Sequence, residues 1–432
     1  MERAFRLALF GLVLTMVALW VLVLGRVGQA EYLLQYMIWD DNRGVIRQIV
    51  DEWNQAHPAE AVQLIVTPWD GYWDKLFAMM VAKQPPDVFW LSPEYREPYI
   101  EKGQLLDLAP YMERDGFSLD EFQPRELVIN WVAGGKVYGI NRDFDTIALF
   151  YNKKLFDEAA IPYPDETWDW DRLLEAALQF KRHFAATGQP EKWPLDIPAW
   201  AQGGWLNLVW QNGGEVLSAD RQSLMLDRPE AVEALQWQAD LVFRHGVSPR
   251  GGPGTIGRLE LFRAGNLAMT YNGSWTCRQV AATEDLDWDV AVLPKGKRRA
   301  VVTNGLAEAV ASHTRHPEAC WRFVQYLVSQ ECQERLPVIA SRKTATAAWV
   351  RSNVYEREVN GRKVQVMIPE HGQAFIDMLA YARAKPITHD VLEWNDILDN
   401  YIGMVLVSGS LDAAEAMRRA AVEVNPILQR SR

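Results

Sequence analysis

Short apolar runs alternate along the chain with longer segments in which apolar residues recur every three to four positions. The runs predict strands, and the periodic segments predict amphipathic helices. This alternation is typical of βαβ units and predicts an α/β fold with a mainly parallel sheet. The predicted strands cover residues 32–39, 62–66, 87–91, 136–140, 147–151, 267–271, 290–293 and 301–303. The predicted helices cover residues 42–57, 72–82, 169–187, 205–212, 227–244, 259–264, 317–336, 390–407 and 411–424.

Local signals refine these boundaries. Asn42, Asn152 and Thr167 stand where a helix N-cap is expected, because their side chains can accept a hydrogen bond from a first-turn amide. The segment 193–204 is rich in Pro and Gly and predicts a loop. Asn360-Gly361 lies between alternating residues and predicts a small β-hairpin.

The length of 432 residues predicts at least two lobes, because single hydrophobic cores stop growing near ~250–300 residues. The shares of 49% hydrophobic and 23% charged residues exclude a disordered or fibrous chain. The formal net charge of −11 argues against a nucleic-acid partner, which requires a basic surface.

One segment near the N-terminus is apolar enough to span a bilayer. Arg3 and Arg6 precede the run Leu7–Leu24, and the small residues Gly28 and Ala30 fit a cleavage site after Ala30. Residues 1–30 are therefore expected to be either a removed signal peptide or a retained membrane anchor. Both alternatives place the rest of the chain outside the cytoplasm, in the periplasm or at the cell surface. No Cys lies near this segment, so a lipoprotein is not expected.

The three cysteines, Cys277, Cys320 and Cys332, predict free and mostly buried thiols. The last two are predicted in one helical stretch, where twelve residues would separate them by ~18 Å, beyond the reach of a disulfide. Their spacing does not suggest a metal site. His313 and His316 have no third ligand nearby and are interpreted as solvated or capping residues.

Motifs of cofactor enzymes are either absent or misplaced. The glycines at 252, 254 and 257 match a dinucleotide fingerprint, but a helix and a loop precede them in place of the required strand. The sequence has no phosphate-binding loop of the Walker type and no nucleophile elbow. We therefore expect no cofactor, no metal and no enzyme. The carboxylate pairs Asp40/Asp41 and Asp143/Asp145 leave a glycoside hydrolase open as a less favoured alternative.

Aromatic and acidic residues follow two predicted strands at the ends where α/β proteins bind ligands. Trp39-Asp40-Asp41 ends the first strand, and Trp90-Leu91-Ser92 ends the third. Indole faces pack on the C–H face of sugar rings, and carboxylates accept hydroxyl protons. The total of 19 Trp agrees with a ligand that is flat or ring-shaped. A half-buried Trp beside solvated Asp is the structural alternative for each pair.

Three ordered motifs resemble the family 1 extracellular solute-binding proteins of ABC importers, in particular the carbohydrate-binding, maltose-binding-protein-like members. They are Tyr138-Gly139-Ile140, then Leu149-Phe150-Tyr151-Asn152-Lys153-Lys154-Leu155-Phe156, and Ala268-Met269-Thr270-Tyr271-Asn272-Gly273-Ser274-Trp275. The resemblance covers about residues 31–425. The chain departs from the family at Asn141, where many members have Pro, and in lacking the lipid-attachment Cys of many members.

The resemblance implies a two-lobe periplasmic-binding-protein fold of the type II-like class, with hinge crossovers between the lobes and a ligand cleft. Lobe 1 would comprise residues 31–140 and 280–336, and lobe 2 would comprise residues 145–275 and 340–432. Hinge bending would close the lobes on the ligand.

The resemblance also implies ligand-binding positions. Asp41, with its neighbour Asp40, and Trp90 would line one lobe, and either Asp143 or Asp145 would bind the sugar at the first crossover. Further implied positions are Trp200, Trp205, Asn272, Trp275 and Trp394.

The expected function is that of a monomeric binding protein that delivers a carbohydrate, in particular an oligosaccharide, to ABC permease subunits. Closure would follow from the higher affinity of the closed form for the ligand. The alternatives are a protein that binds a non-sugar solute, such as glycerol phosphate or a polyamine, and a sugar sensor.

Overall fold

The computed structural model describes residues 32–41, 44–250, 255–352, 354–359, 362–367 and 369–430. The chain divides into two compact units. Unit 1 is formed by Met1–Trp90 and Val310–Gln325, and unit 2 by Leu91–Ala309 and Tyr326–Arg432. The predicted signal peptide or anchor at 1–30 and the predicted cap Asn42 lie outside the described residues. The lobe boundaries expected from the sequence stay a prediction.

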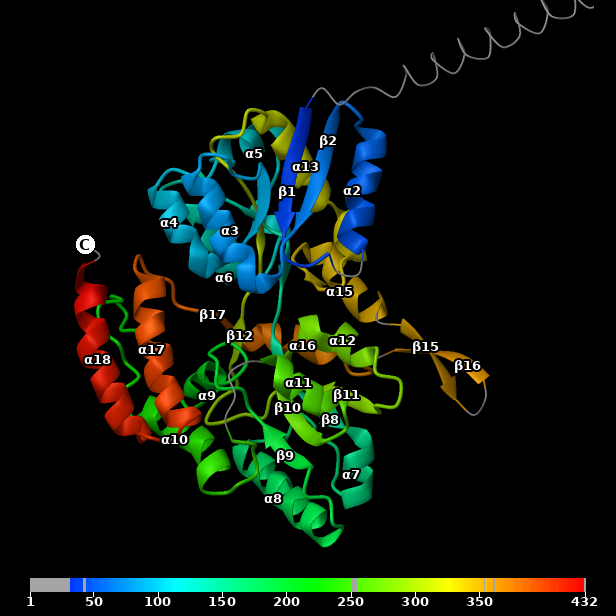
Figure 1. The fold of residues 1–432 in the computed structure, drawn as a ribbon, viewed down its shortest axis with the longest axis vertical. Helices are drawn as coiled ribbons and strands as arrows, with labels where there is room; N and C mark the ends of the chain where they lie inside the picture. The colour runs from blue at the N-terminus through cyan, green and yellow to red at the C-terminus, as the bar shows by residue number, and fades with distance from the viewer. Residues whose placement is uncertain are drawn as a thin grey trace, which may run out of the picture. The chain divides into compact units, whose positions relative to one another are not determined.

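Unit 1 is built on a parallel βαβ arrangement. Strand β1 (Tyr32–Ile38) pairs in parallel with β2 (Glu60–Val66) along its whole length and with β3 (Val88–Leu91) at Tyr36 and Met37. Helices α2 (Val45–Ala56) and α3 (Trp69–Val81) form the two connections (Figure 1). All four residues of β3 are buried, as expected of a parallel strand covered on both faces, whereas β2 at the edge of the sheet buries only Val62.

The main sheet of unit 2 is mixed. Strand β8 (Ile147–Asn152) pairs antiparallel with both β10 (Leu267–Gly273) and β11 (Trp288–Ala291), and β9 (Trp193–Asp196) pairs in parallel with β10. The mainly parallel sheet predicted from the alternation of elements is therefore confirmed in unit 1 but is wrong for this sheet. Every residue of β8 and β10 is buried, which explains why both read as continuous apolar runs.

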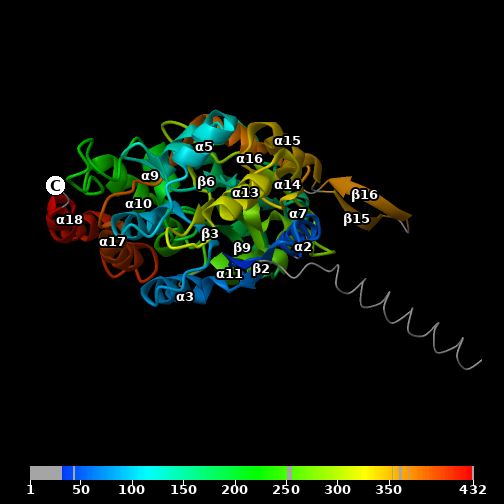
Figure 2. The ribbon, with the colours of Figure 1, turned by 90° about the horizontal axis from the view of Figure 1, so that it is seen from above.

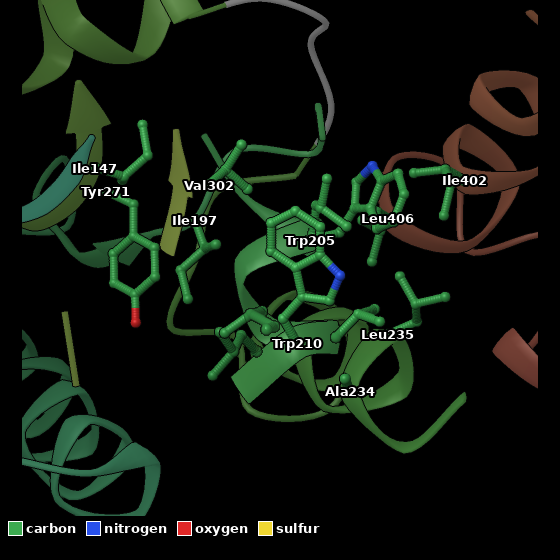
Figure 3. Close-up of a cluster of buried hydrophobic side chains, with 14 of the residues drawn as sticks. Ile147, Ile197, Trp205, Trp210, Ala234, Leu235, Tyr271, Val302, Ile402 and Leu406 are labelled. Atoms are coloured by element: carbon green, nitrogen blue, oxygen red, sulfur yellow. The ribbon is translucent and has the colours of Figure 1, made fainter. Parts of the chain in front are cut away.

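The largest core of unit 2 surrounds helix α9 (Trp205–Gln211), which is buried at all seven positions. Trp205 and Trp210 pack among side chains of α10 (Pro229–Phe243) and α17 (Val391–Leu406) (Figure 3). Helix α18 (Ala413–Arg430) lies alongside α17 in both ribbon views (Figures 1 and 2). The helices predicted at 205–212, 227–244, 390–407 and 411–424 are confirmed as α9, α10, α17 and α18.

The remaining elements are mostly short. The other helices are α4 (Arg96–Glu101), α5 (Ala109–Asp115), α6 (Arg125–Val128), α7 (Lys153–Ala159), α8 (Trp170–Ala186), α11 (Thr255–Arg263), α12 (Cys277–Ala281), α13 (Pro317–Leu327), α14 (Gln330–Arg335), α15 (Lys343–Ser352) and α16 (Gln373–Asp377). The 3-10 turns are η1 (Pro93–Tyr95), η2 (Leu119–Glu121), η3 (Ile129–Trp131), η4 (Ser274–Thr276) and η5 (Met378–Tyr381). The other strands are β4 (Val132–Ala133), β5 (Lys136–Val137), β6 (Ile140–Asn141), β7 (Asp143–Phe144), β12 (Val301–Thr303), β13 (Ala307–Val310), β14 (Ile339–Ala340), β15 (Val354–Val359), β16 (Arg362–Met367) and β17 (Ala382–Ala384).

Several local expectations differ from the structure. The N-cap of α8 is Asp169, whose carboxylate accepts from the Arg172 amide, while Thr167 donates to Asp165 two residues earlier. The predicted loop at 193–204 begins with β9, because its backbone pairs with β10 despite Pro194. The predicted helix 317–336 is two helices, interrupted where Ser329 caps α14.

Other expectations are confirmed. Asn152 caps α7 through a bond from the Leu155 amide. All three cysteines are free and buried. β15 and β16 form the predicted antiparallel hairpin, which stands out from the rest of its unit (Figures 1 and 2), although its turn at 360–361 lies outside the described residues. Within the part of the chain that the structure describes, no helix has both the length and the apolar character needed to cross a bilayer.

Candidate functional site

Asp145 is the centre of a polar cluster in unit 2. Its Oδ1 accepts a hydrogen bond from Nε2 of Gln202 at 2.6 Å and from the amide of Asn304 at 3.3 Å. Asn304 in turn lies 3.5 Å from Gln202 through their side-chain amides. Three segments that are far apart in the sequence therefore place a carboxylate and two amides together, a combination that can both donate and accept hydrogen bonds.

Asp143 occupies a different environment, although it lies only two residues away. It is 5% exposed and forms a buried ion pair with Arg142, and its Oδ1 accepts from the Leu306 amide at 2.9 Å. Arg142 also lies 3.7 Å from the buried Glu308. Burial raises the pKa of Asp143, and Arg142 partly opposes this effect. These partners give Asp143 a structural role in holding Arg142.

The charge environment of Asp145 favours its neutral form. Burial, and then the neighbouring charge of Asp143, raise the pKa of Asp145 well above its ordinary value, while Lys385 acts in the opposite direction. Lys385 is itself held 2.7 Å from Oε1 of Glu94. Burial alone would raise the pKa of Glu94, but the charge of Lys385 brings it below its ordinary value.

A pocket of about 350 Å³, open solvent at its mouth included, lies beside this cluster within unit 2. Its polar lining consists of Glu94, Asn130, Asn304, Lys385 and Asn395, and its apolar lining includes Leu127, Ile387 and Val391. Nδ2 of Asn130 is buried and has no hydrogen-bond partner among the described residues. A ligand with hydroxyl groups could supply the missing acceptor.

Two indoles stand close to each other at half-buried positions of the same unit. The ring centroids of Trp200 and Trp275 are 6.2 Å apart. Each ring rests on a glycine, since a Cβ built on Gly273 would lie 1.8 Å from Trp275 and one built on Gly203 would lie 2.5 Å from Trp200. Trp200 precedes Gln202 of the Asp145 cluster by two residues, so the sequence links the indole pair to the polar groups.

Three other predicted ligand residues of unit 2 are buried. Trp205 is 2% exposed in the core around α9, and Trp394 is 1% exposed with its Nε1 donating to Thr388 at 2.7 Å. On α17 the residues that line the pocket are Val391 and Asn395, on either side of Trp394. Asn272 is 2% exposed, and its Oδ1 accepts from the Gly273 amide. Their predicted contact with a ligand stays a prediction.

In unit 1, the predicted residues near the ends of β1 and β3 have structural partners. Trp90 is 1% exposed, and its Nε1 donates to the Tyr36 hydroxyl at 2.6 Å. Asp41 accepts from the Arg47 amide at 2.9 Å and pairs with its Nε at 3.3 Å, which fixes the start of α2. Asp40 is exposed beside it. The predicted contacts of Asp40, Asp41 and Trp90 with a ligand stay predictions.

A nest of aromatic rings surrounds Trp39 at the same end of the unit 1 sheet. Its ring centroid lies 5.0 Å from Trp90, 5.1 Å from Trp69 and 5.7 Å from Trp73. Trp69 is 48% exposed and Trp39 half-buried, so the nest presents indole surface to solvent. Sequence reasoning noticed Trp39 but missed Trp69 and Trp73, although their position after the second strand offered the same strand-end signal.

Comparison with known proteins shows the family of this chain. The family description "bacterial extracellular solute-binding protein" matches residues 39–334. The chain belongs to this family. The solute-binding protein is 23% identical to a putative binding protein of Brucella abortus over 87% of each chain. It is also 23% identical to an arabinooligosaccharide-binding protein of Bacillus subtilis over 66% of each chain.

Solved structures share the fold of this solute-binding protein. An ABC substrate-binding protein of Listeria monocytogenes in complex with cycloalternan matches with a TM-score of 0.80 at 22% identity, over 92% of this chain and 99% of that one. The cyclic alpha-maltosyl-1,6-maltose binding protein of Arthrobacter globiformis matches with a TM-score of 0.73 at 21% identity, over 92% and 99%. The predicted α/β fold of the solute-binding family is thus confirmed.

Sequence reasoning missed six polar residues that the fold of this solute-binding protein brings to the pocket or to Asp145. They are Glu94, Asn130, Gln202, Asn304, Lys385 and Asn395. None of them belongs to a motif, and hydrophobic periodicity carries no information about which polar loop residues meet. The positions of Gln202 close to the predicted Trp200, and of Asn395 next to the predicted Trp394, offered a signal.

Proposed function

We propose that this protein is the carbohydrate-binding component of an ABC importer and delivers an oligosaccharide to the membrane permease. The observation that carries the proposal is the combination of Asp145, its amide neighbours Gln202 and Asn304, of which Asn304 lines the pocket, and the Trp200–Trp275 pair. A sugar ring offers hydroxyl groups at its rim and C–H bonds on its face. Carboxylates and amides bind the former, and indoles bind the latter.

Known relatives support an oligosaccharide. Besides the arabinooligosaccharide-binding protein, a maltooligosaccharide ABC transporter solute-binding lipoprotein of Streptococcus pneumoniae is 25% identical over 67% of this chain. Of the two structural neighbours, one was solved in complex with cycloalternan, and the other is a cyclic alpha-maltosyl-1,6-maltose binding protein. We infer that a ring-shaped or short linear oligosaccharide is the ligand class to test first.

The environment of the carboxylates supports binding without catalysis. A glycoside hydrolase needs two available carboxyl groups on either side of one bond. Asp143 is engaged by Arg142 and by the Leu306 amide, which leaves Asp145 as the carboxylate of the pair that can meet a ligand. We therefore propose a binding protein that breaks no bond.

The proposed protein works outside the cytoplasm as a monomer. Its residues 1–30 would serve as a signal peptide or as an uncleaved anchor, and no cysteine precedes Cys277 to carry a lipid. The net charge of −11 does not favour nucleic acid as a partner. A sensor that presents the same sugar to a receptor would use the same site.

Glycerol phosphate is the second candidate ligand. A binding protein for sn-glycerol-3-phosphate from Rhizobium meliloti is 22% identical over 62% of this chain, and Lys385 lines the pocket. The ion pair of Lys385 with Glu94 offsets the charge that a phosphate would require. Amines would instead meet Glu94 and Asp145, so polyamines belong in the same screen.

The experiment is a thermal-unfolding screen of the purified chain. Maltooligosaccharides, arabinooligosaccharides, cyclic glucose oligomers, glycerol 3-phosphate and spermidine would be added separately. A ligand at a hundred times its dissociation constant stabilises the folded state by ~2.7 kcal/mol, which gives a clear shift in Tm. A shift with a sugar supports the proposal. A shift only with the phosphate or the amine, or release of product from an aryl glycoside, contradicts it.

A further inference from the structure

A second group of polar side chains in unit 2 has the composition of a metal site. One ligand atom each of Asp289, Glu370 and His371 lies within 4.8 Å of the other two. Asp289 stands on β11 and is 1% exposed, whereas Glu370 and His371 are exposed just before α16. Nδ1 of His371 lies 2.6 Å from Oδ2 of Asp289, and the amide of His371 donates to Oδ1 at 2.9 Å.

Negative charge dominates this group. The Glu370 carboxylate makes no hydrogen bond or ion pair with any described residue. Asp287 lies two residues before Asp289, and its Oδ1 is 3.9 Å from Nζ of Lys153. Three carboxylates thus face one lysine and one imidazole, so an added cation would improve the local balance of charge.

Tyr151 lies beside this group. It is directly opposite Asp289 in the antiparallel pairing of β8 and β11, so both side chains lie on the same face of the sheet. Tyr151 is 3% exposed, so the group lies on a face of the sheet that carries a buried aromatic residue.

We propose that Asp289, Glu370 and His371 bind a zinc ion. Carboxylate and imidazole ligands suit zinc, whereas calcium and magnesium prefer all-oxygen sites. Tetrahedral zinc with bonds of ~2.0–2.2 Å needs neighbouring ligand atoms about 3.3 Å apart. The separation of 2.6 Å between Nδ1 and Oδ2 would open by a small rotation of the His371 ring, which is 66% exposed.

Zinc binding would also fix the tautomer of His371. Nδ1 must present its lone pair to the metal, so the neutral ring carries its hydrogen on Nε2. Water would occupy the fourth position. The ion would then fasten the segment before α16 to the edge strand β11. The site lies at the Tyr151 end of β8, away from Asp145, which precedes the start of that strand.

The test is zinc titration of the full chain without a histidine tag, followed by calorimetry. We expect one zinc per chain and a higher Tm with zinc. His371→Ala and Glu370→Gln should each raise the dissociation constant by at least about tenfold, the size of effect that even indirect ligand partners produce. Calcium and magnesium should produce no comparable shift. Both substitutions are at exposed positions, so the result does not depend on replacing the buried Asp289.

His389→Ala is the matched control. His389 is also exposed and also pairs with a carboxylate, that of Glu101, but it belongs to no group of three ligands within the described residues. Its replacement should leave zinc affinity unchanged. Absence of stoichiometric zinc binding by the wild-type chain, or equal loss of affinity in His371→Ala and His389→Ala, would overturn the proposal. Either result would leave the sugar site untouched, because the titration contains no sugar.

Discussion

The side-chain amide of Gln202 donates a hydrogen bond of 2.6 Å to the carboxylate of Asp145. This contact joins the segment that carries Trp200 to the segment that carries Asp145, 57 residues away in the sequence. It also orients the carboxylate so that its second oxygen is left for another donor. For this reason we propose Asp145, and not Asp143, as the carboxylate that meets a sugar hydroxyl.

The first prediction separates these two aspartates. Asp145→Asn should weaken sugar binding at least about tenfold, because a charge-assisted hydrogen bond contributes ~1.5–3 kcal/mol, while the protein remains folded. Asp143→Asn should instead lower the free energy of unfolding by about 3 kcal/mol, because it leaves the buried Arg142 without its nearest counter-charge. Calorimetry with the sugar and chemical denaturation measure the two effects. Equal sugar affinity in Asp145→Asn and the wild type would remove Asp145 from the site.

The second prediction concerns pH. Because the folded pKa of Asp145 is raised, the folded state holds this proton more tightly than the unfolded chain, and ionisation costs stability as the pH rises through that pKa. Sugar binding by the carboxylate has the opposite sign: affinity should fall as the pH drops through the raised pKa, well before pH 3.8 is reached. Calorimetry between pH 4.5 and 8 should show this loss in the wild type and a flat profile in Asp145→Asn. The same profile in both proteins would contradict the assignment.

The sequence predicted the positions of helices and strands better than it predicted which of them pair with one another. The strands β8 and β10 are mostly apolar and buried at every position, and burial on both faces left a signal that the apolar pattern detects. The direction of strand pairing left no such signal. Strand β8 is antiparallel to both β10 and β11, although helices separate it from them in the sequence. Pairing direction depends on how distant segments pack, which a single sequence does not encode locally.

The candidate site shows the same limit. Trp200 and Trp275 were predicted from motifs and do lie together, yet the roles of Trp205 and Trp394 could not be separated from theirs by sequence. A Trp is equally able to fill a core and to stack on a ligand, and only the direction of its side chain decides. Trp394 is turned to the core while Asn395 lines the pocket, a difference of one residue on a helix.

The third prediction tests whether the position of an indole matters. Trp275→Ala should weaken sugar binding at least about tenfold, since the stacking of a sugar ring on an aromatic ring contributes on the order of 1 kcal/mol or more. Gly273→Ala should produce a similar loss without deleting the ring, because its Cβ would lie 1.8 Å from the far edge of the indole and displace it.

Gly403→Ala is the control for that substitution. It adds a methyl group in α17 where nothing lies within 4 Å, so affinity should be unchanged and stability should rise by about 0.5–1 kcal/mol. Calorimetry and thermal unfolding of the three variants decide the matter. If Gly273→Ala binds sugar as the wild type does, the placement of the Trp275 ring is unimportant.

The last prediction compares two indoles of the aromatic nest in unit 1. Trp90 is 1% exposed and hydrogen-bonded to Tyr36, so Trp90→Ala should lower the free energy of unfolding by ~3–5 kcal/mol. Trp69 is 48% exposed, so Trp69→Ala should change stability by less than ~1 kcal/mol. If the nest also binds sugar, Trp69→Ala should weaken binding several-fold at unchanged stability. Chemical denaturation and calorimetry on both variants separate the two roles. Full affinity in Trp69→Ala would assign the exposed part of the nest to another purpose, whereas strong destabilisation would show that its solvent-facing ring also supports the fold.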